Sequence, residues 1–208
     1  MSKIRSFFVY IVTGLLLLTA VGFSAPAESL LIPLLSDIPK IDGVLDDSIW
    51  LEEALLFEQF FQLSPTEGGP PTEKTVVYMG YDRKNLYVAV KCYDSEPGKI
   101  RASITNRDQC LEDDWVVVFL DTFNEKRRAL SFLSNPLGVQ MDCIRIEEGG
   151  NDNMDFSWDV AFTSAGKIDG DGYSVEMAIP FKSLRFPDDE IKMWSLVLGR
   201  NIARTGEI

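Results

Sequence analysis

The stretch TVVYMGYDRKNLYVAVKCYD, residues Thr75–Asp94, decides the fold of this chain. It contains two runs in which apolar side chains recur at every second position, separated by the polar turn Asp82–Asn85. Residues two apart lie on the same face of a strand, and two such runs joined by a short polar turn are typical of a β-hairpin. The sequence therefore predicts two antiparallel strands here.

The same pattern recurs along the rest of the chain. WVVVFLD (Trp115–Asp121) is apolar on both faces, which indicates a central strand. A second hairpin is expected around NPLG (Asn135–Gly138), a third around DGDG (Asp169–Gly172), and a last strand in MWSLVLGRNIA. Short strands with turns every 8–12 residues predict an all-β fold, an antiparallel β-sandwich of the jelly-roll or immunoglobulin-like kind. One or two short helical turns are expected, near Trp50 and after Pro180.

The N-terminal segment has the composition of a secretory signal peptide. Lys3 and Arg5 precede the apolar run Phe7–Phe23, which is followed by the small residues of Ala25-Pro26-Ala27. We expect residues 1–27 to be removed, 28–37 to form a leader, and 38–208 to form the sandwich domain. The alternative is an uncleaved N-terminal anchor. Either way the chain is expected to be exported, to the periplasm, the outer membrane or the extracellular space.

Charge and composition exclude several classes of function. The formal net charge is −12, so the surface repels phosphate backbones and nucleic acid is not an expected partner. The sequence has no histidine, which excludes Ser-His-Asp and Cys-His catalysis and His-ligated zinc. Carboxylate chemistry, oxygen-ligated metals and binding without chemistry remain.

The chain has three cysteines, an odd number that does not form a disulfide framework. Cys92 lies on the apolar face of its predicted strand, so we expect a buried thiol. A single bridge between two of the three is the alternative.

KIDGVLDDSIW, Lys40–Trp50, is an acidic stretch with a structural interpretation. Asp42 and Gly43 are a favourable pair for a turn, and Asp46 or Asp47 is expected to cap a short helix that carries Trp50 into the core. The alternative is a calcium ligand role for Asp42 or Asp46.

NRDQCLEDDWVVVFLD, residues 106–121, surrounds the central strand with acids. Calcium takes six to eight oxygen ligands, and an acidic loop at a strand end suits it. We therefore consider Asp108, Asp113, Asp114 and Asp121 as ligands of a structural calcium ion, with a solvated acidic loop as the alternative.

Five motifs occur in a recognisable order: IDGVLDDSIW, NLYVAVKCYD, DDWVVVFLDT, NPLGVQMD and GYSVEMAIPFKSL. Together they resemble carbohydrate-binding module family 9 and its family-9-like domains, over residues 38–203. SWDVAF and FKSLRFP are most similar to the branch in which the domain precedes an outer-membrane barrel of unknown function. The resemblance implies a β-sandwich that binds sugar chains, often with structural calcium. In well-understood members two tryptophans clamp a terminal sugar ring, and no tryptophan of this chain matches that clamp as a motif.

Four residues are the candidates for contact with sugar. Trp115 begins the central strand at the rim of the sandwich, and Trp158 follows an acidic loop, where binding residues are common. Asn135 and Arg107 are candidate hydrogen-bond partners of sugar hydroxyls. Core packing is the alternative for Trp115, and stabilisation of their own turns is the alternative for Asn135 and Arg107.

Three functions follow. The first is a secreted, non-catalytic module that binds plant-type or other polysaccharide chains, or their ends, by aromatic stacking and hydrogen bonds. The second is a glycosidase, which needs two carboxylates but no histidine. Glu176 is the clear strand glutamate, and no second carboxylate stands at a matching position. The third is an interaction domain or fragment of a larger outer-membrane protein. The expected partners are oligosaccharides or polysaccharides, and outer-membrane barrel or glycosidase domains.

Overall fold

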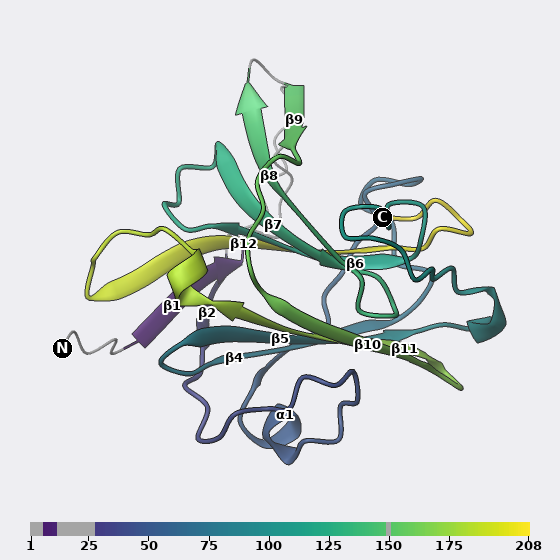
Figure 1. Cartoon of the computed structure of the whole chain (residues 1–208), viewed down its shortest axis with the longest axis horizontal. Helices are drawn as coiled ribbons and strands as arrows, with labels where there is room; N and C mark the ends of the chain where they lie inside the picture. Colours follow the sequence, from purple (N-terminus) through teal and green to yellow (C-terminus); the bar gives the residue numbers. More distant parts are fainter. Residues whose placement is uncertain (1–5, 12–27, 149–150) are drawn as a thin grey trace.

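The computed structural model describes residues 6–11, 28–148 and 151–208 and consists of two packed β-sheets (Figure 1). Sheet A has seven strands and sheet B has five. Sheet A contains, in spatial order, β2 (Glu28–Ile32), β1 (Ser6–Ile11), β12 (Ile191–Asn201), β6 (Trp115–Asp121), β7 (Arg128–Ser134), β8 (Gln140–Glu148) and β9 (Asn151–Asp155). Sheet B contains β10 (Thr163–Asp169), β11 (Gly172–Pro180), β5 (Asn85–Tyr93), β4 (Thr75–Tyr81) and β3 (Leu55–Phe57).

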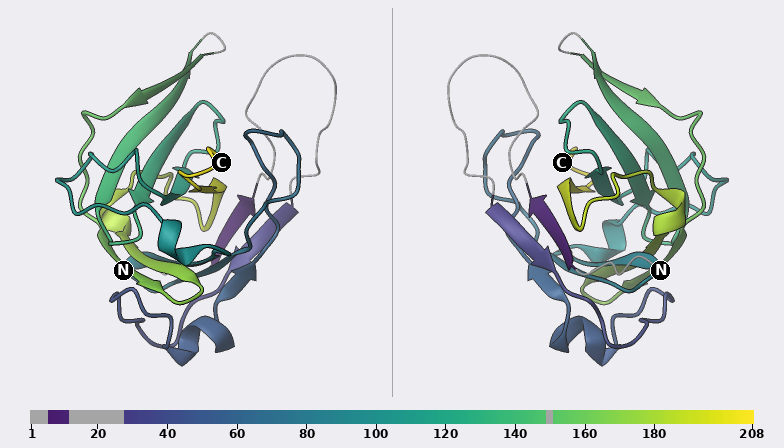
Figure 2. Two further views of the ribbon diagram at one scale, coloured as in Figure 1. Left: turned by 90° about the vertical axis from the view of Figure 1, so that its right-hand side faces the viewer. Right: turned by 90° about the vertical axis from the view of Figure 1, so that its left-hand side faces the viewer.

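The predicted β-sandwich is confirmed. The three expected hairpins are β4–β5, β7–β8 and β10–β11, and the expected central strand is β6. Among the strand pairs that the structure describes, β1–β12 is parallel and the others are antiparallel. Helix is confined to α1 (Ser48–Glu52) and the 3-10 turns η1 (Pro97–Lys99) and η2 (Phe181–Ser183) within the described chain. In Figures 1 and 2, α1 and the β8–β9 hairpin lie at opposite ends of the molecule.

The main core lies between the two sheets because each contributes alternate apolar side chains. On β11, Tyr173, Val175, Met177 and Ile179 are all fully buried there, as the period-two pattern predicted. Cys92 lies in the same core, and all three cysteines are free thiols.

A second apolar cluster covers the outer face of sheet B. The segment containing α1 folds over that face and places Trp50 against Tyr87 and Ala89. Trp50 is only 1% exposed, so its predicted place in the core is confirmed. The burial of both faces of β5 explains why its sequence is apolar at almost every position.

Glu176, on the outer face of β11, joins this covering segment to the sheet. Its carboxylate accepts hydrogen bonds from the backbone N–H of Asp42 (2.9 Å) and Gly43 (2.8 Å) and from Trp50 Nε1 (2.9 Å). Ser174, on the same face, donates to the Gly43 carbonyl oxygen (2.6 Å). A fully buried carboxylate needs such partners, because burial without them is costly.

The predicted side-chain cap of the helix is wrong. Asp47 occupies the position before α1, but its side chain does not cap the helix. Its carboxylate instead accepts a hydrogen bond from the Lys40 backbone N–H (2.8 Å), and so closes the loop that precedes the helix. The predicted Asp42-Gly43 turn is confirmed, since Asp42 Oδ1 accepts from the Val44 N–H (3.0 Å) and Gly43 has a φ of 84°.

Gly43 also marks the closest approach between separate segments. A Cβ at this position would lie 2.7 Å from the carbonyl carbon of Gly166 on β10. A Cβ on Gly166 would in turn lie 2.6 Å from the carbonyl oxygen of Pro136, in the β7–β8 turn. Three segments far apart in sequence therefore meet through backbone alone, which only glycine permits.

The N-terminal region is described in part. β1 lies within the predicted signal peptide, whereas residues 1–5 and 12–27 of that peptide lie outside the described residues. β2 begins at Glu28, in the predicted leader, and its Ile32 is buried in the main core. Cleavage after Ala27 stays a prediction.

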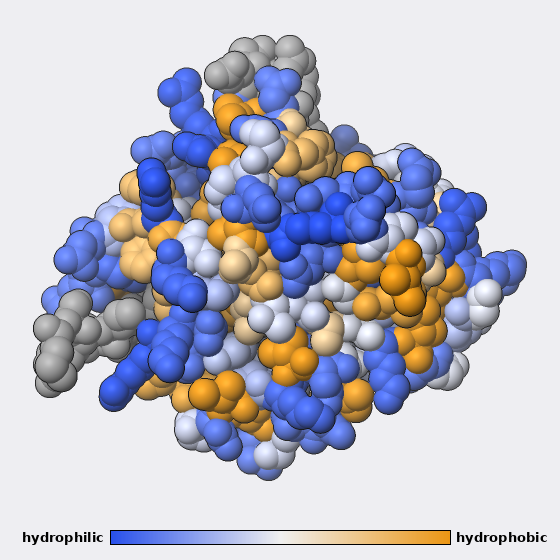
Figure 3. All heavy atoms as spheres, viewed as in Figure 1, coloured by the Kyte–Doolittle hydropathy of each residue, from blue (hydrophilic) through white to orange (hydrophobic). Residues whose placement is uncertain are grey.

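The described residues contain no helix with the length and apolar character needed to span a membrane. On the face shown in Figure 3, hydrophobic residues form small groups separated by hydrophilic ones.

Candidate functional site

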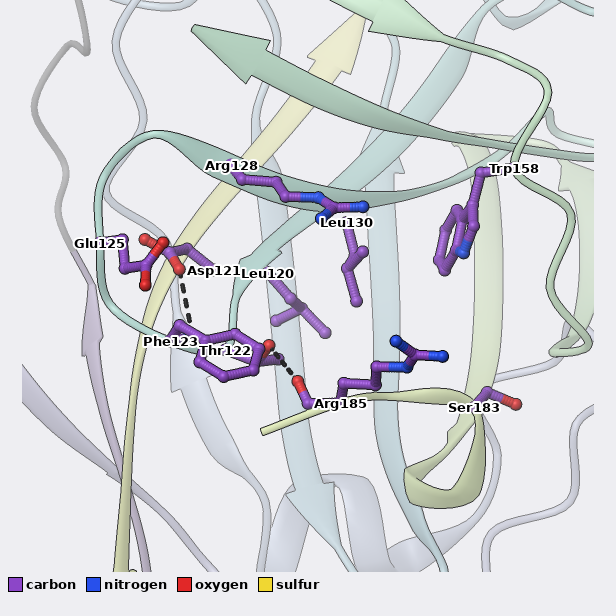
Figure 4. Close-up of a pocket in the computed structure, with 10 residues that line it drawn as sticks. All are labelled: Leu120, Asp121, Thr122, Phe123, Glu125, Arg128, Leu130, Trp158, Ser183 and Arg185. Carbon is purple, nitrogen blue, oxygen red and sulfur yellow. Dashed lines mark hydrogen bonds between the residues drawn. The ribbon is translucent and has the colours of Figure 1, made fainter. Parts of the chain in front are cut away.

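A cleft of about 500 Å³ lies where β6 ends and β7 begins (Figure 4). This volume is within the usual range for small-molecule sites. Its lining residues come from β6 and the turn after it, from β7, from the loop after β9 and from the segment around η2: Leu120, Asp121, Thr122, Phe123, Glu125, Arg128, Leu130, Trp158, Ser183 and Arg185.

The floor of the cleft continues the inner face of sheet A. Arg128, Leu130 and Phe132 alternate along β7 and therefore share a face. Phe132 is fully buried in the main core, Leu130 is half-buried, and Arg128 is exposed. The cleft thus begins where the apolar face of β7 reaches solvent.

Trp158 forms one wall and is partly buried against the core. Its ring packs edge-on against Phe132, with ring centroids 5.9 Å apart. A core residue thus fixes the indole from behind while its other side lines the cleft, a geometry that suits stacking on a ligand.

Arg107 holds the loop that carries Trp158. Its guanidinium donates to the Val160 carbonyl oxygen (2.6 Å) and to Asp142, and its Nε lies 3.3 Å from Asp159. The Asp142 carboxylate also accepts from the Val160 N–H (2.8 Å). Burial raises the pKa of Asp142, and Arg107 acts in the opposite direction. Arg107 is outside the cleft and positions Trp158 through its loop.

Phe123 stands on the opposite side of the cleft from Trp158, and the segment after η2 lies between the two (Figure 4). Thr122 Oγ1 donates to the Arg185 carbonyl oxygen (2.6 Å), which ties this segment to the end of β6. Phe123 follows and is 53% exposed. Thr122 and Phe123 also line a second hollow of about 340 Å³ that extends toward Trp194 on β12. Phe123 therefore stands between two adjoining concave surfaces.

The structure places the other sugar-contact candidates away from the cleft. Trp115 is on the outer face of sheet A, where it packs with Val117 and Leu133 and donates from Nε1 to the Leu111 carbonyl oxygen (3.3 Å). Asn135 is fully buried in the β7–β8 turn. Its Oδ1 accepts from the backbone N–H of Val139 (2.9 Å), among others, so it stabilises its own turn.

Asp113 and Asp114, two of the candidate calcium ligands, act as buried acceptors. Asp113 accepts hydrogen bonds from the Ser103 N–H (2.9 Å) and from Asn135 Nδ2 (2.8 Å). Asp114 accepts from the Ala203 N–H (3.0 Å), and burial raises its pKa.

Asp108 and Asp121, the other two, lie elsewhere. Asp108 accepts from the Asp142 N–H (3.1 Å). Asp121, at the far end of β6 from Asp113 and Asp114, accepts from the backbone N–H of Phe123 (3.2 Å) and Lys126 (2.6 Å). The described part of the chain contains no group of three or more acidic or cysteine side chains that could hold a metal ion. Calcium binding stays a prediction.

Glu176, the candidate of the glycosidase hypothesis, does not line the cleft. It faces α1 across the outer face of sheet B, where three N–H donors occupy its carboxylate. The carboxylates in the cleft are Asp121 and Glu125, and Asp121 is engaged by its own turn.

Sequence reasoning missed Phe123, Glu125, Arg128 and Arg185 as cleft residues. Phe123 and Glu125 belong to the turn between two predicted strands, where a single aromatic residue was the available signal, and Arg128 is the first residue of β7. Arg185 lies in FKSLRFP, which gives no indication of its neighbours in space.

Comparisons with known proteins agree with this fold. The family model described as carbohydrate family 9 binding domain-like matches residues 41–197. No curated protein matches the chain. A family 9 carbohydrate-binding module from Caldicellulosiruptor kristjanssonii is similar in two solved structures, each 21% identical. In complex with glucose, it has a TM-score of 0.50, with 76% of this chain and 71% of that chain covered. In complex with cellotriose, the TM-score is 0.48, with 72% and 66% covered, so the chain spans slightly less than two thirds of that module. A putative carbohydrate-binding protein from Bacteroides uniformis is 10% identical, with 83% and 89% covered and a TM-score of 0.54.

Proposed function

The chain belongs to the carbohydrate family 9 binding domain-like family, and from this premise we propose that it is a non-catalytic module that binds polysaccharide chains in the cleft beside Trp158. The observation that supports this most directly is the supported indole. Trp158 has a core residue behind it, open space before it, and polar side chains around it. Sugar rings have apolar C–H faces and polar hydroxyl rims, and this cleft offers surfaces complementary to both.

Phe123 and Trp158 line the same cleft. They take the role that the family resemblance assigned to a pair of tryptophans. The second hollow beyond Phe123 gives room for a neighbouring sugar unit, so a chain is a better fit than a single ring.

Binding tests this proposal directly. We expect millimolar or tighter binding of at least one oligosaccharide class by calorimetry, with glucose-based oligomers as the first class because a solved relative is a glucose complex. Trp158→Ala should weaken binding about 5- to 30-fold, the equivalent of about 1–2 kcal/mol for one stacked aromatic. Trp115→Ala is the matched control, because that ring is also half-buried but lies on the outer face of sheet A. Equal losses for the two variants would contradict the assignment of the site.

The non-catalytic part of the proposal has its own test. Prolonged incubation of the purified chain with oligosaccharides should release no reducing sugar. Sustained release that is abolished by Glu125→Gln, at the free carboxylate of the cleft, would identify a glycosidase instead.

The proposal also includes export through a signal peptide, a structural calcium ion and association with a barrel or glycosidase domain, and each has its own test. Mass spectrometry of the exported protein should give an N-terminus at Glu28 if residues 1–27 are a signal peptide. A melting temperature that falls on addition of a chelator and recovers with calcium would support a structural ion. Co-purification with a barrel or glycosidase domain would support an accessory role at the cell surface.

A further inference from the structure

Two arginines from separate elements extend toward the Trp158 side of the cleft. Arg128 begins β7, and Arg185 follows η2. In Figure 4 both guanidinium ends extend toward the side of the cleft where Trp158 stands. Asp121 and Glu125 lie on the other side, so the cleft has a cationic half and an anionic half.

Arg128 and Arg185 are both exposed where they line the cleft. Among the residues that the structure describes, neither guanidinium forms an ion pair or a hydrogen bond. Hydrogen bonds from Ser157 lower the pKa of Asp155, which lies outside the cleft, and the charge of Arg128 acts in the same direction. Arg107, which has a structural role nearby, is by contrast held by carboxylates.

The position of these two charges favours an anionic ligand. The chain has 32 acidic and 20 basic residues, so most of its surface repels anions. Two like charges that converge on one space are stabilised when an anion enters between them. The planar guanidinium fork matches the two oxygens of a carboxylate, and such bidentate contacts are among the strongest hydrogen bonds in proteins.

We propose that the sugar unit stacked on Trp158 carries a carboxylate, and that the cleft therefore recognises uronate-containing chains through Arg128 and Arg185. This inference rests on the proposed function, because it names the class of sugar that the same cleft prefers. The anionic half, around Glu125, then accepts hydroxyl hydrogen bonds from the adjoining sugar unit.

The test compares acidic ligands with neutral ones built on the same sugar units. Oligogalacturonate and its methyl ester share one carbohydrate skeleton, and glucuronoxylan and alginate oligomers extend the set to other uronates. We expect at least one acidic oligomer to bind about tenfold or more tightly than its methyl ester at low salt. The difference should shrink as ionic strength rises.

Variants connect this preference to the two arginines. Arg128→Gln and Arg185→Gln should each weaken binding of the acidic oligomer about tenfold and leave binding of the ester within about twofold. Arg128→Lys should recover only part of the loss, because lysine keeps the charge but not the fork. Arg101→Gln is the matched control, since Arg101 is also exposed but neighbours Asp114, at the other end of β6. Because the substituted side chains are exposed, unchanged melting temperatures are expected and show that the variants are folded.

The outcomes separate the two proposals. Binding of neutral sugars with no gain for any uronate overturns the inference and leaves the proposed function in place. Binding of sulfated oligosaccharides without binding of uronates overturns the carboxylate assignment. Failure of every sugar to bind overturns both.

Discussion

Glu176 provides the sharpest test of how the fold is held together. Replacing Glu176 with Gln keeps the shape of the side chain but leaves one acceptor oxygen where there were two. If that oxygen keeps the bonds to the Asp42 and Gly43 N–H groups, the new amide N–H₂ faces the Trp50 Nε1–H. One buried hydrogen bond is then replaced by two opposed donors.

The expected loss follows from these contacts. A buried donor without an acceptor costs about 1–3 kcal/mol, and the two remaining bonds lose about 0.5–1 kcal/mol each when their acceptor becomes neutral. Because the buried charge is also removed, part of this cost is offset. We expect the free energy of unfolding at pH 7 to fall by about 2–4 kcal/mol.

Urea denaturation followed by far-UV circular dichroism measures this loss, because the slope of the transition also reports whether the folded state stays compact. Trp50→Phe removes the indole donor together with the volume of its five-membered ring, and should cost about 2–3 kcal/mol. In the double variant the two losses should be less than additive by about 1 kcal/mol. A loss below about 0.5 kcal/mol for Glu176→Gln would refute the role assigned to this carboxylate.

Three further predictions concern the glycine contact, the Trp158 loop and the thiols. Gly43→Ala should destabilise the protein by about 2 kcal/mol or more in thermal melts, because the new Cβ would sit at a φ of 84° and clash with the Gly166 backbone. Gly98→Ala is the control and should leave stability unchanged, because a Cβ at Gly98 would meet no other atom. Arg107→Ala should lower the free energy of unfolding in urea by about 2–4 kcal/mol, because it leaves Asp142 buried without its cation, and it should also weaken sugar binding. Unchanged stability and unchanged binding would contradict the role of Arg107 in holding the Trp158 loop. Burial raises the pKa of Cys110 to about 11. A thiol reagent at pH 8 should therefore modify Cys110 in the native chain at least 100-fold more slowly than in the urea-unfolded chain. Fast labelling of Cys110 in the native chain would contradict its burial.

The strands could be predicted because their pattern is local. Alternation along β4–β5, β7–β8 and β10–β11 fixed which residues form strands and which face is buried. β9 was missed because its sequence, NDNMD, is polar and it lies at the edge of sheet A. Its strand character comes from pairing with β8 rather than from its own propensity.

The site was predictable only in part, because the alternation of apolar residues along a strand does not show which other segment packs against that face of the strand. Trp158 was identified from its position after a loop, and the structure places it in the cleft. Trp115 looked equally suitable, yet its ring packs in the cluster on the outer face of sheet A. Arg128 and Arg185 are 57 positions apart in the sequence, so their convergence depends on the packing of the two sheets.

The bond between Glu176 and the Asp42–Trp50 segment has a consequence for how this sequence can diverge. The two most recognisable motifs, IDGVLDDSIW and GYSVEMAIPF, are separate in the chain but are two sides of one contact. A substitution that removes the carboxylate frees the turn glycine and the tryptophan from their partner, and the reverse also holds. We therefore expect relatives to lose or keep the two motifs as a pair, and the cleft residues, which take no part in this contact, to vary independently of them.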